Sequence, residues 1–310
     1  MLFNFFLANH LSGGLKGMPD LVQPIFHGLV EAGHDVIGFG LGLQGAPAVN
    51  VLVEFFPDDG FTENVLRLKA QSGDKFIFGI LCTEDIEDAL VMQQPEFPRR
   101  RANLERLLPA ADFVWTLLPQ LQAYEALAGA GKVALLEYGF SERFLNRHLV
   151  TEPSLRDVDV LMYGNETPHR MGVLGELRRR GLNCLASDRQ VLPEFITADI
   201  LRRSKIVLDL RRGPGVRYPS PTRICKAVHS GALVVAEDLG ESAISNLYRF
   251  TIACPYDGIV DRCGGIIQAG QYAALGLEAL ARFRTETSMR ANVMRALRLP
   301  ALDALAARMA

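Results

Sequence analysis

The chain has 310 residues, of which 49% are hydrophobic and 22% charged, and its formal net charge is −2. These values describe an ordinary globular protein of about two domains, and they exclude a strongly basic nucleic-acid-binding chain and an acidic disordered tail. The five cysteines are scattered and form no C-x-x-C pair, which excludes a zinc site of that kind and fits a reducing, cytoplasmic location.

Short apolar runs alternate with helical segments through the first half of the chain. The runs are 2–8, 36–39, 51–55, 76–81, 113–117 and 133–136, with helices expected at 19–32, 62–71 and 99–108. Apolar runs of this length separated by helices are typical of a parallel sheet covered on both faces. The first run lacks the basic flank and cleavage site of a signal peptide, and no run is long enough to predict a transmembrane segment.

The pattern restarts after a polar stretch, 147–157. Strands are expected at 158–163, 183–187, 206–210, 232–236 and 250–253, and helices at 169–180, 222–229, 259–269, 271–283 and 288–309. The sequence therefore predicts an α/β protein with two doubly wound, Rossmann-like domains and an interdomain cleft. The expected divisions are 1–148, 149–285 and a C-terminal helix at 286–310.

The segment 211–238 carries the strongest functional signal. An apolar strand leads into a loop rich in Gly, Pro and Arg, then into a helix, a glycine and a second strand. The cations of this segment are Arg211, Arg212, Arg217, Arg223 and Lys226. Cations gathered at a strand end beside a helix N-terminus predict an anion-binding site, with a solvated basic loop as the alternative. Arg223 and Lys226 are three residues apart, so both can point at one anion.

Five stretches carry a resemblance to a known family. They are LSGGLKGMPDLVQPIFHGLVEAGHDV near the start, ADFVWTLLPQLQAYEALAGAGKVALLEYGFSERFL with its element YGFSERF at 138–144, DVDVLMYGNETPHRMGVLGELRRRGL after the polar stretch, RICKAVHSGALVVAEDLGE around the basic helix, and the tail YDGIVDRCGGII…ARFRTETSMRANV. In this order they resemble the GT-B class of glycosyltransferases, most closely the group-1 and CgeB-like (spore-protein-like) families. The resemblance implies hexosyl transfer from a nucleoside-diphosphate sugar. The acceptor stays open: a glycan, a lipid-linked molecule or a protein.

The resemblance also implies how the donor is held. Cations and helix amides stabilise the departing diphosphate in many GT-B enzymes, so we expect Arg211, Arg217, Arg223 and Lys226 to do so here without a metal or other cofactor. Many retaining members carry two glutamates eight residues apart around this helix. Tyr218 and Lys226 stand in their places, which leaves the stereochemistry, and activity itself, open.

Further donor contacts are expected where strands end. Backbone amides at Gly13 and Gly14 would approach a phosphate or sugar, or form a simple tight turn. Gly164 and Asn165 end the first strand of the second domain, where donor phosphates approach or the chain simply turns. Glu237 would accept hydrogen bonds from hydroxyl groups of the donor, or cap the helix that follows.

Two places offer a catalytic base. Glu84 and Asp85 follow an apolar strand at its carboxyl end, where a catalytic carboxylate belongs in such a sheet. They also fit the N-terminal cap and first turn of a helix beginning near residue 86, which is the alternative. His10, beside the glycine pair, is the other candidate, with a neutral loop histidine as its alternative.

Two rival functions remain. A catalytically inactive GT-B-like protein that binds a nucleotide or sugar is favoured by the missing glutamate pair. A nucleotide-sugar epimerase would place several acids and a histidine around the cleft, where only a sparse set is visible. No G-x-G-x-x-G follows a first strand, so a dinucleotide oxidoreductase is not expected. The net charge gives no reason to expect a nucleic-acid partner.

Overall fold

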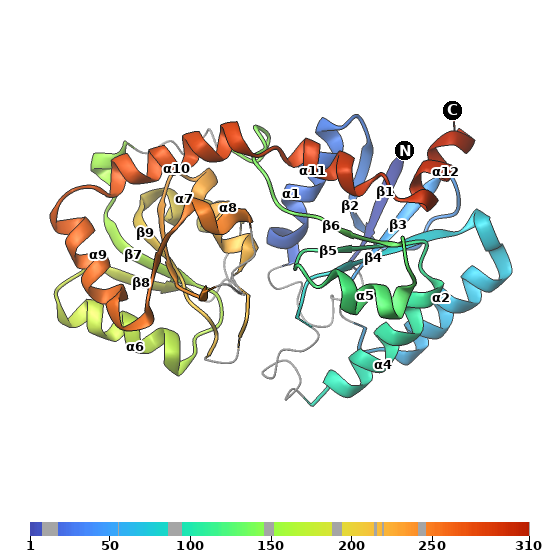
Figure 1. Ribbon diagram of the computed structural model, residues 1–310, viewed down its shortest axis with the longest axis horizontal. Coiled ribbons are helices and arrows are strands. Elements are labelled where there is room, and N and C mark those ends of the chain that lie inside the picture. The colour runs from blue at the N-terminus through green and yellow to red at the C-terminus, as the bar shows by residue number, and fades with distance from the viewer. Residues whose placement is uncertain are drawn as a thin grey trace. The chain divides into compact units, whose positions relative to one another are not determined.

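The computed structural model describes residues 1–7, 18–54, 56–85, 95–145, 152–187, 194–213, 216–218, 220–240 and 246–309. The chain divides into two compact units (Figure 1). The first comprises Met1–Glu137 together with Met289–Ala310, and the second comprises Tyr138–Ser288. The first unit is therefore built from two segments that are far apart in the sequence.

The first unit contains a parallel sheet of six strands within its described residues. Their bounds are β1 Leu2–Phe6, β2 Asp35–Gly40, β3 Ala48–Val53, β4 Ile77–Cys82, β5 Phe113–Thr116 and β6 Val133–Leu135, and their order across the sheet is β2-β1-β3-β4-β5-β6. β3, β4 and β5 are buried along their whole length, because helices cover both faces of the sheet.

The helices of the first unit come from both of its segments. They are α1 Met18–Glu31, α2 Asp59–Ser72, α4 Phe97–Leu107, α5 Leu121–Ala128, α11 Met289–Ala296 and α12 Pro300–Met309, with single 3₁₀ turns at Gly73–Lys75 and Leu108–Ala110. The single helix expected at 288–309 is wrong. Pro300 has no N–H to continue a helix, and it instead begins the second of two helices.

The second unit contains a parallel five-stranded sheet in the part of the chain that the structure describes. Its strands are β7 Val158–Tyr163, β8 Cys184–Ser187, β9 Ser204–Asp209, β10 Leu233–Glu237 and β11 Ile252–Cys254, in the order β11-β10-β9-β7-β8. Its helices are α6 Pro168–Arg179, α7 Glu194–Arg203, α8 Pro221–His229, α9 Ile259–Gln268 and α10 Tyr272–Glu286, with 3₁₀ turns at Pro153–Leu155, Asn246–Phe250 and Tyr256–Gly258.

Both sheets wind in the same way, and this positions the candidate sites. The first strand of each sheet pairs with the second strand on one side and with the third on the other: β1 lies between β2 and β3, and β7 lies between β8 and β9. The winding direction of the chain reverses at that point. Ligands of doubly wound proteins bind beyond the carboxyl ends of the strands there. The expectation of two parallel, doubly wound sheets is confirmed.

Candidate functional site

The two loops at the reversal point of the second sheet lie against one another. β7 ends at Tyr163 and leads into Gly164 and Asn165, while β9 leads into Leu210 and Arg211. Gly164 has φ 109°, a conformation that L side chains rarely adopt. A Cβ added there would lie 3.0 Å from a terminal nitrogen of Arg223. Glycine at this position therefore permits both the turn and the close approach of the arginine.

Arg170 ties these two loops together. Its guanidinium donates to the carbonyl oxygen of Asn165 at 2.8 Å, to that of Leu210 at 2.8 and 3.0 Å, and to that of Arg211 at 3.1 Å. The side chain is buried, in the first turn of α6. Arg170 was not among the predicted site residues, although a cation in a first turn opposes the helix dipole and is therefore a signal in the sequence.

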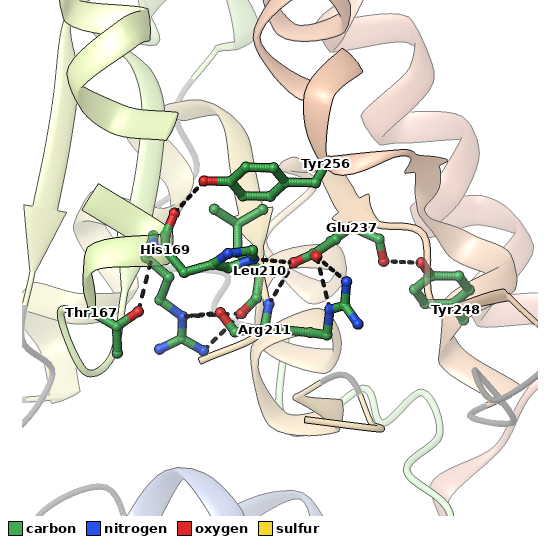
Figure 2. Close-up of polar contacts among 8 residues, drawn as sticks. Thr167, His169, Leu210, Arg211, Glu237, Tyr248 and Tyr256 are labelled. Carbon is green, nitrogen blue, oxygen red and sulfur yellow. Dashed lines mark hydrogen bonds and ion pairs between the residues drawn. The ribbon is translucent and has the colours of Figure 1, made fainter. Parts of the chain in front are cut away.

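Glu237 is the centre of a hydrogen-bonded network (Figure 2). It ends β10 with only 1% of its side chain exposed. Its Oε1 accepts from Arg211 Nε at 2.8 Å and from a terminal nitrogen of Arg211 at 2.5 Å. Its Oε2 accepts from the backbone N–H of Arg211 at 3.1 Å and pairs with His169 Nε2 at 2.9 Å. Burial raises the pKa of Glu237, but the hydrogen bonds from Arg211 and His169 outweigh that effect and hold the pKa below its ordinary value.

The network is continued by two aromatic residues. The rings of His169 and Tyr256 stack with centroids 4.1 Å apart, and the Tyr256 hydroxyl donates to the His169 carbonyl oxygen at 2.8 Å. The Tyr248 hydroxyl donates to the carbonyl oxygen of Glu237. Figure 2 shows Glu237 between Arg211 and His169, with Tyr256 beyond His169. His169 and Tyr256 were not among the residues that the sequence singled out.

The predicted cations lie in three different environments. Arg211 is paired with Glu237 as described above. Arg223 is only 4% exposed; it forms an ion pair with Asp209 at the end of β9 and donates to the carbonyl oxygen of Tyr163 at 3.0 Å. Lys226 is buried on α8, whereas Arg217 is exposed and lies over the ring of Tyr218. The charges of Arg211 and Arg223 are thus already balanced by carboxylates within the unit.

The N-terminal end of α8 offers polar groups beside these cations. The Thr222 side chain is buried, and its hydroxyl has no hydrogen-bond partner among the residues that the structure describes. Helix N-termini leave backbone N–H groups available to anions, and α8 also begins with Pro221, which fits the first helical position. The prediction of an anion site at this end of α8 stays a prediction, with Thr222 added to its candidates.

Three predicted residues of the first unit, His10, Gly13 and Gly14, lie outside the described residues. Glu84 and Asp85 lie beyond the carboxyl end of β4, as expected. Glu84 forms an ion pair with Arg100 of α4 at 2.7 Å, and Asp85 is buried and accepts a hydrogen bond from the Gln120 amide. The helix start that was the alternative for these acids also lies outside the described ranges. Both carboxylates are engaged with neighbouring side chains.

Comparisons with known proteins establish the fold class. No family model matches the chain, and no curated protein does. An α-glucosyltransferase solved with UDP and a 13-mer DNA containing a central A:G mismatch is similar over 98% of this chain and 99% of its own, with a TM-score of 0.63 and 8% identity. A UDP-forming α,α-trehalose-phosphate synthase from Burkholderia xenovorans is similar over 84% of this chain and 74% of its own, with a TM-score of 0.51 and 11% identity.

At these identities the likeness concerns the fold alone. The chain has the two-sheet α/β fold of GT-B glycosyltransferases, and it ends in the helices α11 and α12. An α-glucosyltransferase in complex with UDP, at a TM-score of 0.60 and 9% identity, matches 98% of this chain and 99% of its own. The similarity therefore spans both units. This similarity does not show membership of the CgeB-like family.

Two searches of the described residues bear on partners and cofactors. None of the described helices is long and apolar enough to cross a membrane. No group of three or more His, Cys, Asp or Glu side chains suited to a metal ion occurs in the described ranges.

Proposed function

We propose that this chain is a glycosyltransferase that transfers a sugar from a nucleoside-diphosphate sugar to a hydroxyl-bearing acceptor. The observation that supports this most is the carboxyl edge of the second sheet. There the start of α8 and the loops after β7 and β9 meet at the point where the winding reverses. The fold similarity to structures solved with UDP adds support across the full chain.

The donor diphosphate is proposed to bind at the N-terminal end of α8. Arg217 is exposed in the loop before the helix, and Thr222 contributes a buried hydroxyl. Arg211 and Arg223 are paired with carboxylates, so their proposed role is to shape the loops around the ligand rather than to act as free cations. Charge stabilisation by fixed donors makes a metal unnecessary, so we propose that the reaction is metal-independent. A CgeB-like family and a glycan, lipid-linked or protein acceptor remain part of the proposal.

The test is the thermal stability of the purified protein with nucleoside diphosphates and their sugars, in the presence of EDTA. A ligand at a hundredfold excess over its dissociation constant adds about 2.7 kcal/mol of stability. Arg217→Ala should weaken the binding of the best ligand about tenfold, because one charge-assisted contact is lost. Arg290→Ala, an exposed arginine on α11, is the matched control. A folded protein that responds to no member of the panel contradicts the proposal.

One observation favours the second candidate, an inactive nucleotide- or sugar-binding protein. Tyr218 and Lys226 occupy the places of the glutamate pair, and Lys226 is buried on α8. Release of nucleoside diphosphate from the best sugar nucleotide separates the two functions. Binding together with turnover supports the transferase, whereas binding without turnover supports the inactive relative.

A further inference from the structure

The first unit holds a buried carboxylate that was not among the predicted site residues. Glu54 follows β3 directly, and its side chain is 7% exposed. β3 pairs with β1 on one side and with β4 on the other. Because β1 and β3 flank the reversal point of the first sheet, Glu54 stands at the edge where doubly wound sheets bind ligands.

Among the residues that the structure describes, hydrogen-bond donors contact only one of the two carboxylate oxygens of Glu54. Oε2 accepts hydrogen bonds from the backbone N–H of Thr83 at 2.8 Å and of Glu84 at 3.3 Å. Oε1 makes no hydrogen bond within the described ranges. The two backbone donors thus fix the orientation of the carboxyl group, and Oε1 is the oxygen that no described donor contacts.

The groups around Glu54 favour its neutral form. Burial and the charge of Glu84 raise the pKa of Glu54 to about 7, although the backbone hydrogen bonds and Arg100 act in the opposite direction. Cys82 of β4 and Tyr124 of α5 are also close, and burial raises both of their pKa values, so neither adds a charge near neutral pH. A carboxyl group that exchanges its proton near neutral pH is well matched to general acid–base chemistry.

The neighbouring acids are less suited to such a role. Glu84 is held by Arg100, and Asp85 is held by the Gln120 amide. We propose that Glu54 takes the proton of the acceptor hydroxyl in the transfer reaction. This inference rests on the proposed glycosyltransferase function and assigns the base in it.

The acceptor O–H bond breaks, and its proton moves to Glu54 Oε1. The oxygen forms a bond to the anomeric carbon of the donor sugar while the bond from that carbon to the phosphate oxygen breaks. The electron pair of the broken bond leaves on the nucleoside diphosphate. Direct displacement of this kind inverts the anomeric configuration, which agrees with the absence of the glutamate pair at 218 and 226.

The first test uses Glu54→Gln, which keeps the size of the side chain and an oxygen for the two backbone donors. The probe is the sugar nucleotide that stabilises the protein most, with water as the acceptor and release of nucleoside diphosphate as the readout. We expect kcat to fall at least about 100-fold. The melting shift produced by the nucleoside diphosphate should stay that of the wild type. Glu63→Gln, an exposed carboxylate on α2, is the matched control. Unchanged turnover in Glu54→Gln overturns the inference.

The second test separates a proton acceptor from a purely structural carboxylate. Wild-type turnover should rise with pH through a midpoint of about 7. Burial and the charge of Glu84 both raise the pKa of Glu54, and Glu84→Gln removes the second of these effects, so the midpoint should move to lower pH. A structural role would change the melting temperature without moving this midpoint.

An infrared titration measures the protonation of Glu54 directly, without an activity assay. A carboxyl band with a midpoint near 7 should be present in the wild type and absent from Glu54→Gln. A midpoint near 4.5, the ordinary value for glutamate, overturns the inference even if the protein is an active transferase. A wild type that binds no nucleotide and releases none contradicts the proposed function instead, whatever the titration shows.

Discussion

Arg211 and Glu237 lie 26 residues apart and are joined at three points: two guanidinium nitrogens of Arg211 donate to Oε1 of Glu237, and the backbone N–H of Arg211 donates to Oε2. The pair links the loop after β9 to the end of β10. A residue that the sequence presented as a phosphate ligand thus also has a partner inside the fold. A substitution of either residue in the pair is therefore expected to lower the stability of the fold.

Glu237→Gln should lower the free energy of unfolding by about 2 kcal/mol at pH 7, because hydrogen bonds to a buried charged group are lost. The pKa of Glu237 is held below its ordinary value of 4.5 in the folded chain. The contribution of the carboxylate is therefore complete above about pH 4.5 and disappears as the pH falls through the folded pKa. Urea denaturation of both proteins between pH 7 and pH 4 should show the difference shrinking. A difference that grows toward acid pH contradicts the assignment.

Arg223→Ala should destabilise the protein by about 3 to 5 kcal/mol, because it leaves Asp209 buried without its cation. Arg217→Ala changes an exposed residue of the same basic segment and should stay within about 0.5 kcal/mol of the wild type. Chemical denaturation of the two variants compares these values. Arg217→Ala is consequently the cleaner variant for measuring nucleotide binding. Equal stability of the two variants would contradict the buried-pair description.

Arg170→Lys should lower both stability and nucleotide affinity. An ammonium group cannot reproduce the planar donor set that bonds three carbonyl oxygens, so the loops after β7 and β9 lose their connection. We expect a loss of about 2 kcal/mol in the free energy of unfolding. Arg179→Lys, at an exposed position of the same helix, should change neither quantity measurably. Denaturation and nucleotide melting shifts, measured on both variants, check this prediction.

Gly276→Ala should destabilise the second unit by about 1 to 3 kcal/mol. A Cβ at this position of α10 would lie 2.5 Å from the carbonyl oxygen of Gly231 and 3.1 Å from the backbone nitrogen of Leu233. Gly265 of α9 is the control, because a Cβ there has no atom within 4 Å. Gly265→Ala should raise stability by about 0.5 to 1 kcal/mol through helix propensity. Opposite shifts in urea denaturation midpoints are the expected result.

Much of the fold was predictable because buried parallel strands are continuous apolar runs. The strand expected at 158–163 is β7 as observed, and the helix expected at 222–229 differs from α8 by one residue. Pro300 could have been used to predict two helices at the C-terminal end, since proline favours the first position of a helix. The division of the first unit between two distant segments has no such local signal.

The candidate site was predicted less completely, because partners depend on which strands become neighbours. The sequence pattern predicts Arg223 as a free cation, but the structure places Asp209 at the end of β9 beside it. In the sequence, Glu54 is only a polar residue near the end of an apolar run. In the structure, the loop after β4 supplies two backbone donors to its carboxylate. The role of His169 depends on its contact with Glu237, which is 68 residues away in the sequence. Strand ends could be identified from the sequence, but their mutual contacts could not.

The segment Met289–Ala310 completes the first unit, and this has a consequence for biosynthesis. Gly28 on α1 leaves room for Met289 and Val293 of α11, and the Trp115 indole donates to the carbonyl oxygen of Ala296. The ribosome makes all of the second unit before it makes these residues. The first unit is therefore completed after the second. A fragment cut at residue 137 would leave the surface for α11 uncovered, so separate expression of this unit calls for α11 and α12 to be rejoined by a linker.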